Sequence, residues 1–213
     1  MREVILNQVL PQTQMITEYP KEKIGLLGGT FNPPHLGHLI LAEQVGQQLG
    51  LDRVLFLPTN IPPHKEVEDL PSKEDRKNMV EKAIENNPLF GFDDVDLERE
   101  GKSYTYETMK RLYEKYPNAE FYFIIGGDMV ENLPKWHKIE ELRSMVQFVG
   151  VKRPGYAIET NYPIIWVDTP TTDISSTVIR KKIKEGCSVK YLVPEKTLDY
   201  IEQKRLYKNE TKN

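Results

Sequence analysis

The stretch Lys23-Ile-Gly-Leu-Leu-Gly-Gly-Thr-Phe-Asn-Pro-Pro-His-Leu-Gly-His-Leu-Ile-Leu-Ala42 decides the fold. It begins with a short apolar run over residues 24–27, which is typical of a central parallel strand buried on both faces. Gly28 and Gly29 end this run, and apolar residues then recur at helical spacing from Leu36 to Leu49. The stretch therefore predicts a strand, a glycine turn and a helix, a layout that favours a phosphate site at the carboxyl end of the first strand.

Two histidines, His35 and His38, lie in the first turn of the predicted helix and therefore on one face of it. A helix N-terminus with free amides favours phosphate, and two imidazoles beside it can donate hydrogen bonds to phosphate oxygens. The alternative is that both histidines only cap the helix. The stretch contains neither Gly-Lys-Ser/Thr nor Gly-x-Gly-x-x-Gly, so it indicates a phosphate site without either common phosphate-binding motif.

Strands and helices alternate along the rest of the chain. Further strands are predicted at residues 54–57, 89–97, 121–125, 146–151 and 164–167, and further helices at 72–86, 140–144, 175–185 and 195–204. A polar turn at 101–105 is predicted to lead into another helix through Met109, Leu112 and Tyr113, which Pro117 ends. This order predicts the α/β class, namely a single-domain, Rossmann-like, doubly wound parallel sheet with right-handed crossovers. We expect the domain to cover residues 21–206, with an N-terminal extension of unknown role at 1–20 and a polar tail at 207–213.

In such a sheet the ligand lies across the carboxyl ends of the strands, where the strand order reverses. The predicted loops at that edge are 28–38, 58–65, 126–136 and 170–180. The last of them contains Ile174-Ser-Ser-Thr-Val-Ile-Arg180. Ser175 or Ser176 is expected to cap a helix there, which is a common structural role for serine. Arg180 follows about one helical turn later, so its guanidinium can reach the same phosphate.

Composition narrows the class of protein. Hydrophobic residues make up 38% of the chain and charged residues 29%, and the net charge of −3 favours neither nucleic acid nor a membrane surface as a partner. A single cysteine, Cys187, excludes an internal disulfide. The N-terminal apolar stretch is too short for a signal peptide, so the sequence predicts a cytoplasmic protein. The sequence is also compatible with a homo-oligomer.

The motifs together resemble a known family. Gly28-Gly-Thr-Phe-Asn-Pro-Pro-His-Leu-Gly-His38 is similar to the signature of the nucleotidyltransferase superfamily, whose hallmark is His-x-Gly-His, and Ser175-Ser-Thr-x-x-Arg180 resembles its second motif. Within the superfamily the chain resembles the bacterial nicotinate-nucleotide adenylyltransferases over roughly residues 22–204. Four more motifs carry this likeness: Pro62-Pro-His-Lys65, Ser103-Tyr-Thr105, Gly126-Gly-Asp128 and Leu133-Pro-Lys-Trp136. One departure from the family pattern is Gly126-Gly-Asp128, because many members have Gly-Ala-Asp at this place.

The resemblance implies transfer of the adenylyl group of ATP to nicotinate mononucleotide, giving nicotinate adenine dinucleotide and pyrophosphate in NAD biosynthesis, with Mg²⁺ bound mainly through ATP. It implies catalytic roles for His35, His38 and Arg180. The residues expected at ATP are Gly28, Gly29, Thr30, Phe31, His35, Gly37, His38, Gly126, Asp128, Ile174, Ser175, Ser176 and Arg180. Those expected at the acceptor are Asn32, Lys65, Ser103, Tyr104, Thr105 and Trp136.

Three of these residues have structural alternatives. Asp128 follows a strand and is either a ribose ligand or a helix N-cap. Trp136 either stacks on the nicotinate ring, as the resemblance implies, or packs in the core. Lys65 either closes over phosphates or is a solvated charge. Two other functions also stay open, namely adenylyl or cytidylyl transfer to another phosphorylated acceptor and a nucleotide-binding sensor without turnover.

Overall fold

The computed structural model describes residues 20–60, 70–99, 103–151, 160–170 and 172–208. Within these ranges one sheet contains six parallel strands in the order β3-β2-β1-β4-β5-β6. The strands are β1 (Glu22–Gly29), β2 (Arg53–Pro58), β3 (Phe90–Phe92), β4 (Ala119–Gly126), β5 (Gln147–Val151) and β6 (Ile164–Val167). The helices are α1 (Leu36–Leu49), α2 (Lys73–Ile84), α3 (Thr105–Lys115), α4 (Gly127–Val130), the 3₁₀ helix η1 (Leu133–Lys135), α5 (Ile139–Met145), α6 (Ser176–Lys184) and α7 (Glu195–Gln203).

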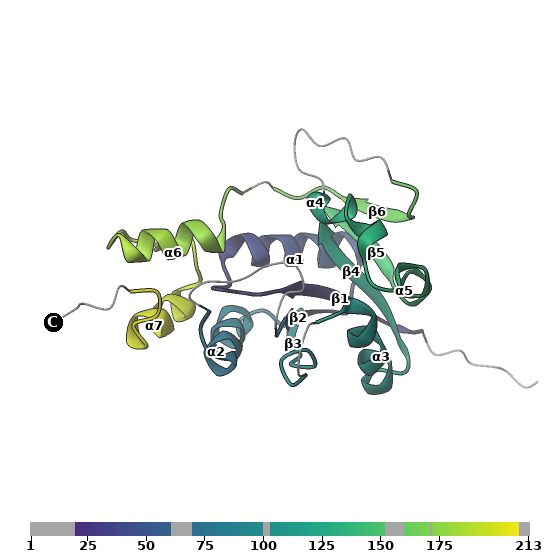
Figure 1. Ribbon diagram of the computed structural model, residues 1–213, viewed down its shortest axis with the longest axis horizontal. Helices are drawn as coiled ribbons and strands as arrows, with labels where there is room; N and C mark the ends of the chain where they lie inside the picture. Colours follow the sequence, from purple (N-terminus) through teal and green to yellow (C-terminus); the bar gives the residue numbers. More distant parts are fainter. Residues whose placement is uncertain (1–19, 61–69, 100–102, 152–159, 171, 209–213) are drawn as a thin grey trace, which may run out of the picture.

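The strand order places the reversal point between β1 and β4. Leu26 of β1 pairs with Leu55 of β2 on one side and with Phe123 of β4 on the other. The chain moves outward from β1 through β2 and β3, and then outward from β4 through β5 and β6 (Figure 1). The predicted doubly wound sheet is confirmed, and the loops after β1 and β4 leave it at the reversal point.

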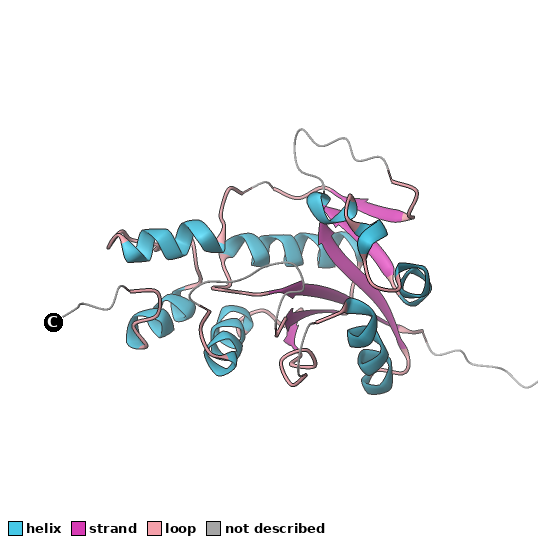
Figure 2. Cartoon of the chain, viewed as in Figure 1, coloured by secondary structure: helices cyan, strands magenta, loops and turns pink. Residues whose placement is uncertain are grey.

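Helices flank the sheet in Figure 2. The apolar residues of its central strands belong to two core clusters, as expected for a parallel sheet that is buried on both faces. On one face, Leu26 belongs to a core cluster with Met109 of α3 and Leu142 of α5. On the other, Leu27 belongs to a cluster with Val45 of α1. Full burial of each such side chain contributes about 1.5–3 kcal/mol, so the strand ends that position the site are firmly anchored.

Helix ends were predictable from local signals. Ser72 is the N-cap of α2 and accepts a hydrogen bond from the amide of Asp75. Gly50 ends α1 in the left-handed conformation, with φ of 57°. Ser175 is the N-cap of α6, with its hydroxyl accepting from the amide of Val178. These three predictions are confirmed.

The last two helices lie together beyond one end of the sheet (left in Figure 1). Helix α7 packs against α2, where Met79 contacts a cluster that includes Tyr200 and Tyr207. Tyr207, placed in the polar tail by the sequence, is buried, so the packed chain extends at least one residue beyond the expected boundary. No helix within the described ranges is long and apolar enough to cross a membrane.

Candidate active site

The loop between β1 and α1 is shaped by Phe31. This residue has φ of 48°, a left-handed conformation that costs a residue with a side chain about 1–2 kcal/mol. Its ring is buried and lies 5.0 Å from the ring of His38, edge to face, and 5.6 Å from that of Phe56. Phe31 therefore supports His38 from the core, which is a packing role in addition to any contact with ATP.

His35 and His38 form a stacked pair, with ring centroids 3.7 Å apart and planes inclined by 24°. The backbone N–H of His35 donates to Nδ1 of His38 at 3.2 Å, so the neutral His38 ring carries its proton on Nε2. Burial lowers the pKa of His35 to about 4. Burial, with a smaller contribution from His35, lowers the pKa of His38 well below its usual value. At neutral pH both rings are uncharged, and His38 has an N–H to donate.

Gly37 stands between the two histidines because another chain segment approaches it closely. A Cβ atom at this position would lie 2.9 Å from Oγ1 of Thr172 and 3.1 Å from Nδ1 of His35. Contacts below 3.0 Å force a neighbour to shift. Gly37 thus leaves room for the side chains of Thr172 and His35, either of which would have to shift to accept a Cβ atom.

The second motif binds directly to the first. Oγ of Ser176 donates to the carbonyl oxygen of Pro33 at 2.8 Å, across 143 residues of sequence. Nη1 of Arg180 donates to the carbonyl oxygen of Asn32, also at 2.8 Å and across 148 residues. The two motifs, which the sequence could place only at the same edge of the sheet, therefore form one site.

The N-terminal amides of α1 are less free than the sequence predicted. The amide of Leu36 donates to the carbonyl oxygen of Leu192 at 2.9 Å, and that of His38 donates to His35 at 2.9 Å. The expectation of free amides is wrong for these two residues, because the segment after α6 supplies one acceptor and the first turn the other. Side-chain donors of the two motifs remain for an anion at this point.

Several buried polar atoms of the loop have no partner within the described part of the chain. The Asn32 side chain is 3% exposed, and neither its Oδ1 nor its Nδ2 forms a hydrogen bond. Nδ1 of His35 is buried and unpaired as well. Each unsatisfied buried group costs about 1–3 kcal/mol, so this cluster of orphaned atoms is typical of a site that a ligand completes.

The turn before α3 is partly engaged by the protein. Ser103 is buried, and its hydroxyl accepts from the amide of Asn60 at 3.1 Å. Tyr104 is exposed at the N-cap position of α3, with its ring centroid 4.9 Å from that of His137. Thr105 is the first residue of α3, the helix that the Ser103–Thr105 turn was predicted to open. Tyr104 and Thr105 therefore lie at the N-terminus of α3, directly after Ser103, which the Asn60 amide holds by a hydrogen bond.

The segment after β4 contains two of the predicted site residues, Trp136 and Asp128. Trp136 is half-buried and packs edge-on against Phe123 and Phe148, with centroid distances of 5.8 and 6.1 Å. These contacts are those of the packing alternative, and stacking on nicotinate stays a prediction. Asp128 is not the N-cap, because Gly126 takes that position and Asp128 lies inside α4. The Asp128 side chain and Lys65 lie outside the described part of the structure.

Comparisons with known proteins support the family that the motifs indicate. Residues 26–182 match the model of the family described as cytidylyltransferase-like. The chain is 52% identical over 205 residues to a probable nicotinate-nucleotide adenylyltransferase of Enterococcus faecalis, covering 96% of this chain and 94% of the relative. It is 48% identical over 188 residues to the nicotinate-nucleotide adenylyltransferase of Bacillus subtilis, covering 88% of this chain and 100% of the relative. The chain belongs to the nicotinate-nucleotide adenylyltransferase family.

Solved structures of more distant proteins show the same fold as this family member. One is the nicotinic acid mononucleotide adenylyltransferase of Plasmodium falciparum complexed with NaAD, with a TM-score of 0.73 at 22% identity. The alignment covers 87% of this chain and 97% of that one. The same enzyme complexed with APC gives a TM-score of 0.72 over the same shares of the two chains.

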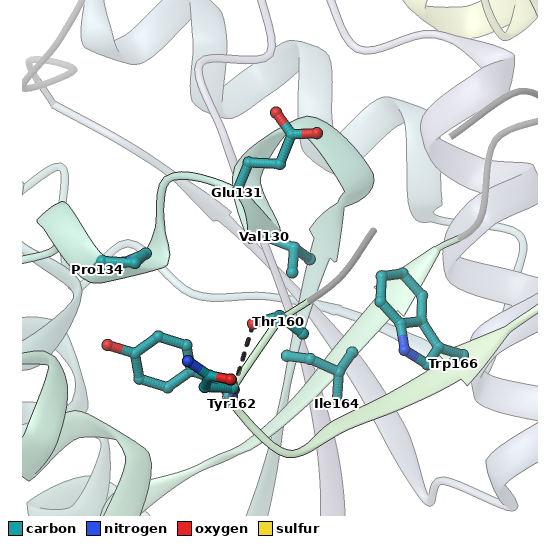
Figure 3. Close-up of a pocket in the computed structure, with 8 residues that line it drawn as sticks. Val130, Glu131, Pro134, Thr160, Tyr162, Ile164 and Trp166 are labelled. Atoms are coloured by element: carbon teal, nitrogen blue, oxygen red, sulfur yellow. Dashed lines mark hydrogen bonds between the residues drawn. The ribbon is translucent and has the colours of Figure 1, made fainter. Parts of the chain in front are cut away.

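A separate hollow of about 670 Å³ lies between the α4–η1 segment and β6 (Figure 3). Its lining residues are Val130, Glu131, Pro134, Thr160, Asn161, Tyr162, Ile164 and Trp166. Tyr162 and Trp166 lie on opposite sides of it in Figure 3. None of the predicted site residues lines this hollow, so it lies apart from the histidine pair.

Sequence reasoning missed contacts made by residues outside the motifs. Thr172 abuts Gly37, Leu192 occupies an amide of α1, and Arg76 contacts the loop after β1. Only Arg76 had a signal in the sequence, because it lies three and four residues before the apolar Met79 and Val80 on the same predicted helix. A charged residue on the apolar face of a helix indicates a specific buried partner.

Proposed function

We propose that this protein transfers the adenylyl group of ATP to nicotinate mononucleotide, giving nicotinate adenine dinucleotide and pyrophosphate in NAD biosynthesis. The observation that carries the proposal is the joining of the two motifs, with Arg180 and Ser176 hydrogen-bonded to the loop that bears the histidines. The names of relatives that are about half identical in sequence support the choice of substrates.

In the proposed reaction, a phosphate oxygen of nicotinate mononucleotide attacks the α-phosphorus of ATP. The new P–O bond forms as the bond between the α-phosphorus and the β-phosphate oxygen breaks, and pyrophosphate leaves with that electron pair. The attacking phosphate is already an anion at neutral pH, so no general base has to remove a proton. The protein's contribution is then positioning of the reactants and stabilisation of phosphate charge.

We propose complementary roles for His35, His38 and Arg180, the three charged or polar side chains of the motifs. Neutral His38 donates Nε2–H to a phosphate oxygen of ATP, and His35 stacks on it and holds its ring. Arg180, whose Nη1 is held by the Asn32 carbonyl, directs a permanent positive charge to the β- and γ-phosphates. A neutral donor and a fixed cation at adjacent phosphates favour the charge distribution of the departing pyrophosphate.

Mg²⁺ is part of the proposal as a companion of ATP. The described residues contain no group of three or more His, Cys, Asp or Glu side chains placed to hold a metal ion. We therefore assign the ion to the triphosphate oxygens and water, where it supplies charge neutralisation when bound. Oxygen ligands of this kind are the ones that Mg²⁺ prefers.

The acceptor is assigned to the other side of the reversal point. Ser103, Tyr104 and Thr105 would read the nicotinate carboxylate at the N-terminus of α3, which is a favourable place for an anion. The exposed part of the Trp136 indole would contact the pyridine ring, and Asn32 would use its unpaired amide. We place the reaction in the cytoplasm, in keeping with the single cysteine of the chain.

Pyrophosphate release tests the proposal. ATP with nicotinate mononucleotide should release pyrophosphate faster than ATP with nicotinamide mononucleotide, and removal of Mg²⁺ by a chelator should abolish the release. Release only with CTP, or only with a different phosphorylated acceptor, would replace the proposed substrates. Binding of ATP without release on any acceptor would identify the protein as a nucleotide sensor.

A further inference from the structure

Arg76 of α2 is a buried cation that touches the two segments leaving the central strands. Arg76 is only 1% exposed. Nη1 donates to the carbonyl oxygen of Thr59 at 2.5 Å and to that of Thr30 at 3.3 Å, and Nη2 donates to the carbonyl oxygen of Asn60 at 3.4 Å. One guanidinium thus contacts the first residue after β1 and the first two residues after β2.

The buried position of Arg76 makes its positive charge energetically unfavourable. Among the described residues, no carboxylate lies within ion-pair distance of its guanidinium, and Nε is buried without a partner. Burial lowers the pKa of Arg76, although a guanidinium keeps its proton in proteins. Burying an unpaired charge costs several kcal/mol, and an apolar side chain would fill the same space without that penalty. The guanidinium therefore has a role that packing alone does not explain.

Peptide geometry shows what the guanidinium does. In a trans peptide the carbonyl and the following N–H point in opposite directions. Because the Thr59 carbonyl is turned toward Arg76, the amide of Asn60 points away from it, and this amide donates to Oγ of Ser103 at 3.1 Å. Nδ2 of Asn60 also donates to the carbonyl oxygen of Arg99 at 2.6 Å. Arg76 is thereby connected, through Asn60, to the turn that begins α3.

The loop after β1 is held from two sides. Arg76 holds the carbonyl of Thr30, and Arg180 holds the carbonyl of Asn32 two residues later. Between them lies Phe31, the left-handed residue whose ring supports His38. The position of His38 therefore depends on two guanidinium groups, of which only Arg180 belongs to a recognised motif.

We propose that Arg76 is a positioning residue that fixes the loop bearing the histidines relative to the Ser103 turn, and so holds the sites of the two reactants in register. The assignment of these two places to ATP and to the mononucleotide rests on the proposed function. The hydrogen bonds that join the two places are observed in the structure and do not depend on the proposed function. Reacting groups displaced by about 1 Å can lose about a hundredfold in rate, so a shift of either loop has a measurable effect on turnover.

Arg76→Met and Arg76→Lys test this role beside the matched control Val80→Ala, which truncates a buried side chain on the same helix. Arg76→Met should lower kcat at least about tenfold and raise KM for both substrates, because the three carbonyls lose their donor. Arg76→Lys should give a smaller loss, because one ammonium keeps the charge but cannot span all three carbonyls. Val80→Ala should lower the melting temperature and leave kcat and KM unchanged.

Two outcomes would overturn the proposal. One is a pair of Arg76 variants that melt at lower temperature but keep wild-type kcat and KM, as Val80→Ala is expected to do. The other is additivity in a double-mutant cycle, in which Ser103→Ala reduces kcat/KM equally in the wild type and in Arg76→Met. If Arg76→Met does not fold, the kinetic constants of Arg76→Lys decide the question.

The affinity for a non-hydrolysable ATP analogue separates this proposal from the proposed function. If the wild-type protein binds the analogue but turns over no mononucleotide, the proposed function fails, and the affinity still reports on the loop after β1. In that case Arg76→Met should bind the analogue at least about tenfold more weakly than Val80→Ala. Equal affinities would show that Arg76 does not position the loop.

Discussion

The two sides of the reversal point are built differently. On the β1 side, the loop 30–35 is tied by side-chain hydrogen bonds to α6 and α2, residues far away in sequence. On the β4 side, Trp136 is held by ring contacts with Phe123 and Phe148, and Tyr104 of the nearby Ser103 turn packs against the ring of His137. The first side is thus fixed by directional bonds, and the second mainly by packing. This difference predicts that the side proposed to bind the phosphates of ATP tolerates less displacement than the side proposed to bind the nicotinate ring.

His38→Ala should produce the largest effect, because it removes a donor from the side fixed by directional bonds. We expect kcat to fall at least about a hundredfold, which is the scale of losing one oxyanion donor. Pyrophosphate release under saturating substrates measures this, and circular dichroism verifies the fold. Near-normal turnover of a folded variant would remove His38 from the chemistry.

Gly37→Ala should come next, because it forces apart the two motifs. The added Cβ would lie 2.9 Å from Oγ1 of Thr172, and overpacking of this kind costs about 1–3 kcal/mol. We expect kcat/KM to fall about ten- to thirtyfold, with a lower melting temperature. The double variant Gly37→Ala/Thr172→Gly removes the clashing hydroxyl and should recover part of both losses. Absence of recovery would mean that Thr172 is not the obstacle.

Trp136→Ala addresses the packed side. We expect the KM for nicotinate mononucleotide to rise about tenfold and the KM for ATP to change little, because base–aromatic stacking is worth about 1–3 kcal/mol. Trp166→Ala, a tryptophan of the separate hollow, is the matched control and should leave both KM values unchanged. An equal rise for both substrates in Trp136→Ala would argue for loss of packing instead of loss of stacking.

The histidine pair predicts a pH dependence of stability. Burial lowers the pKa of His35 to about 4, so between about pH 6.5 and pH 4 the unfolded chain binds more protons than the folded one. The free energy of unfolding should therefore decrease as the pH falls through this window, by at most about 1.4 kcal/mol per pH unit for each histidine. Urea denaturation at pH 7, 6 and 5 measures the slope.

His35→Gln should reduce that slope, because glutamine does not titrate. The effect is the smallest of those expected here, because it acts on stability and leaves the hydrogen bonds of Arg180 in place. A slope that is identical in the wild type and in His35→Gln would show that His35 is not buried in its neutral form.

The sequence predicted those features whose causes are local. Strand β1 followed from a short apolar run, α1 from helical periodicity with Gly50 as its end, and the N-cap of α6 from Ser175. The short α4 was missed, because four residues carry no periodicity. The pattern of residues placed His35, His38, Ser176 and Arg180 at one edge of the sheet, the resemblance to a family implied their roles, and the structure brings them together.

What the sequence could not predict are contacts between distant segments. The acceptor for the Leu36 amide is Leu192, and the neighbour that excludes a side chain at Gly37 is Thr172. Nothing near Leu36 or Gly37 in the sequence identifies either partner, because these contacts form only when the segments before and after α6 pack beside the N-terminus of α1. The packing of Trp136 is of the same kind, since its partners come from β4 and β5.

The bonds from α6 to the histidine loop have a consequence for the order in which a ribosome builds the site. The strands from β1 to β6 are complete once residue 167 has been made, but Ser176, Arg180 and Leu192 come later. A nascent chain can thus assemble its whole sheet while the histidine loop still lacks the groups that fix it. A chain cut before residue 176 would therefore contain the six strands but none of the three groups that hold the histidine loop.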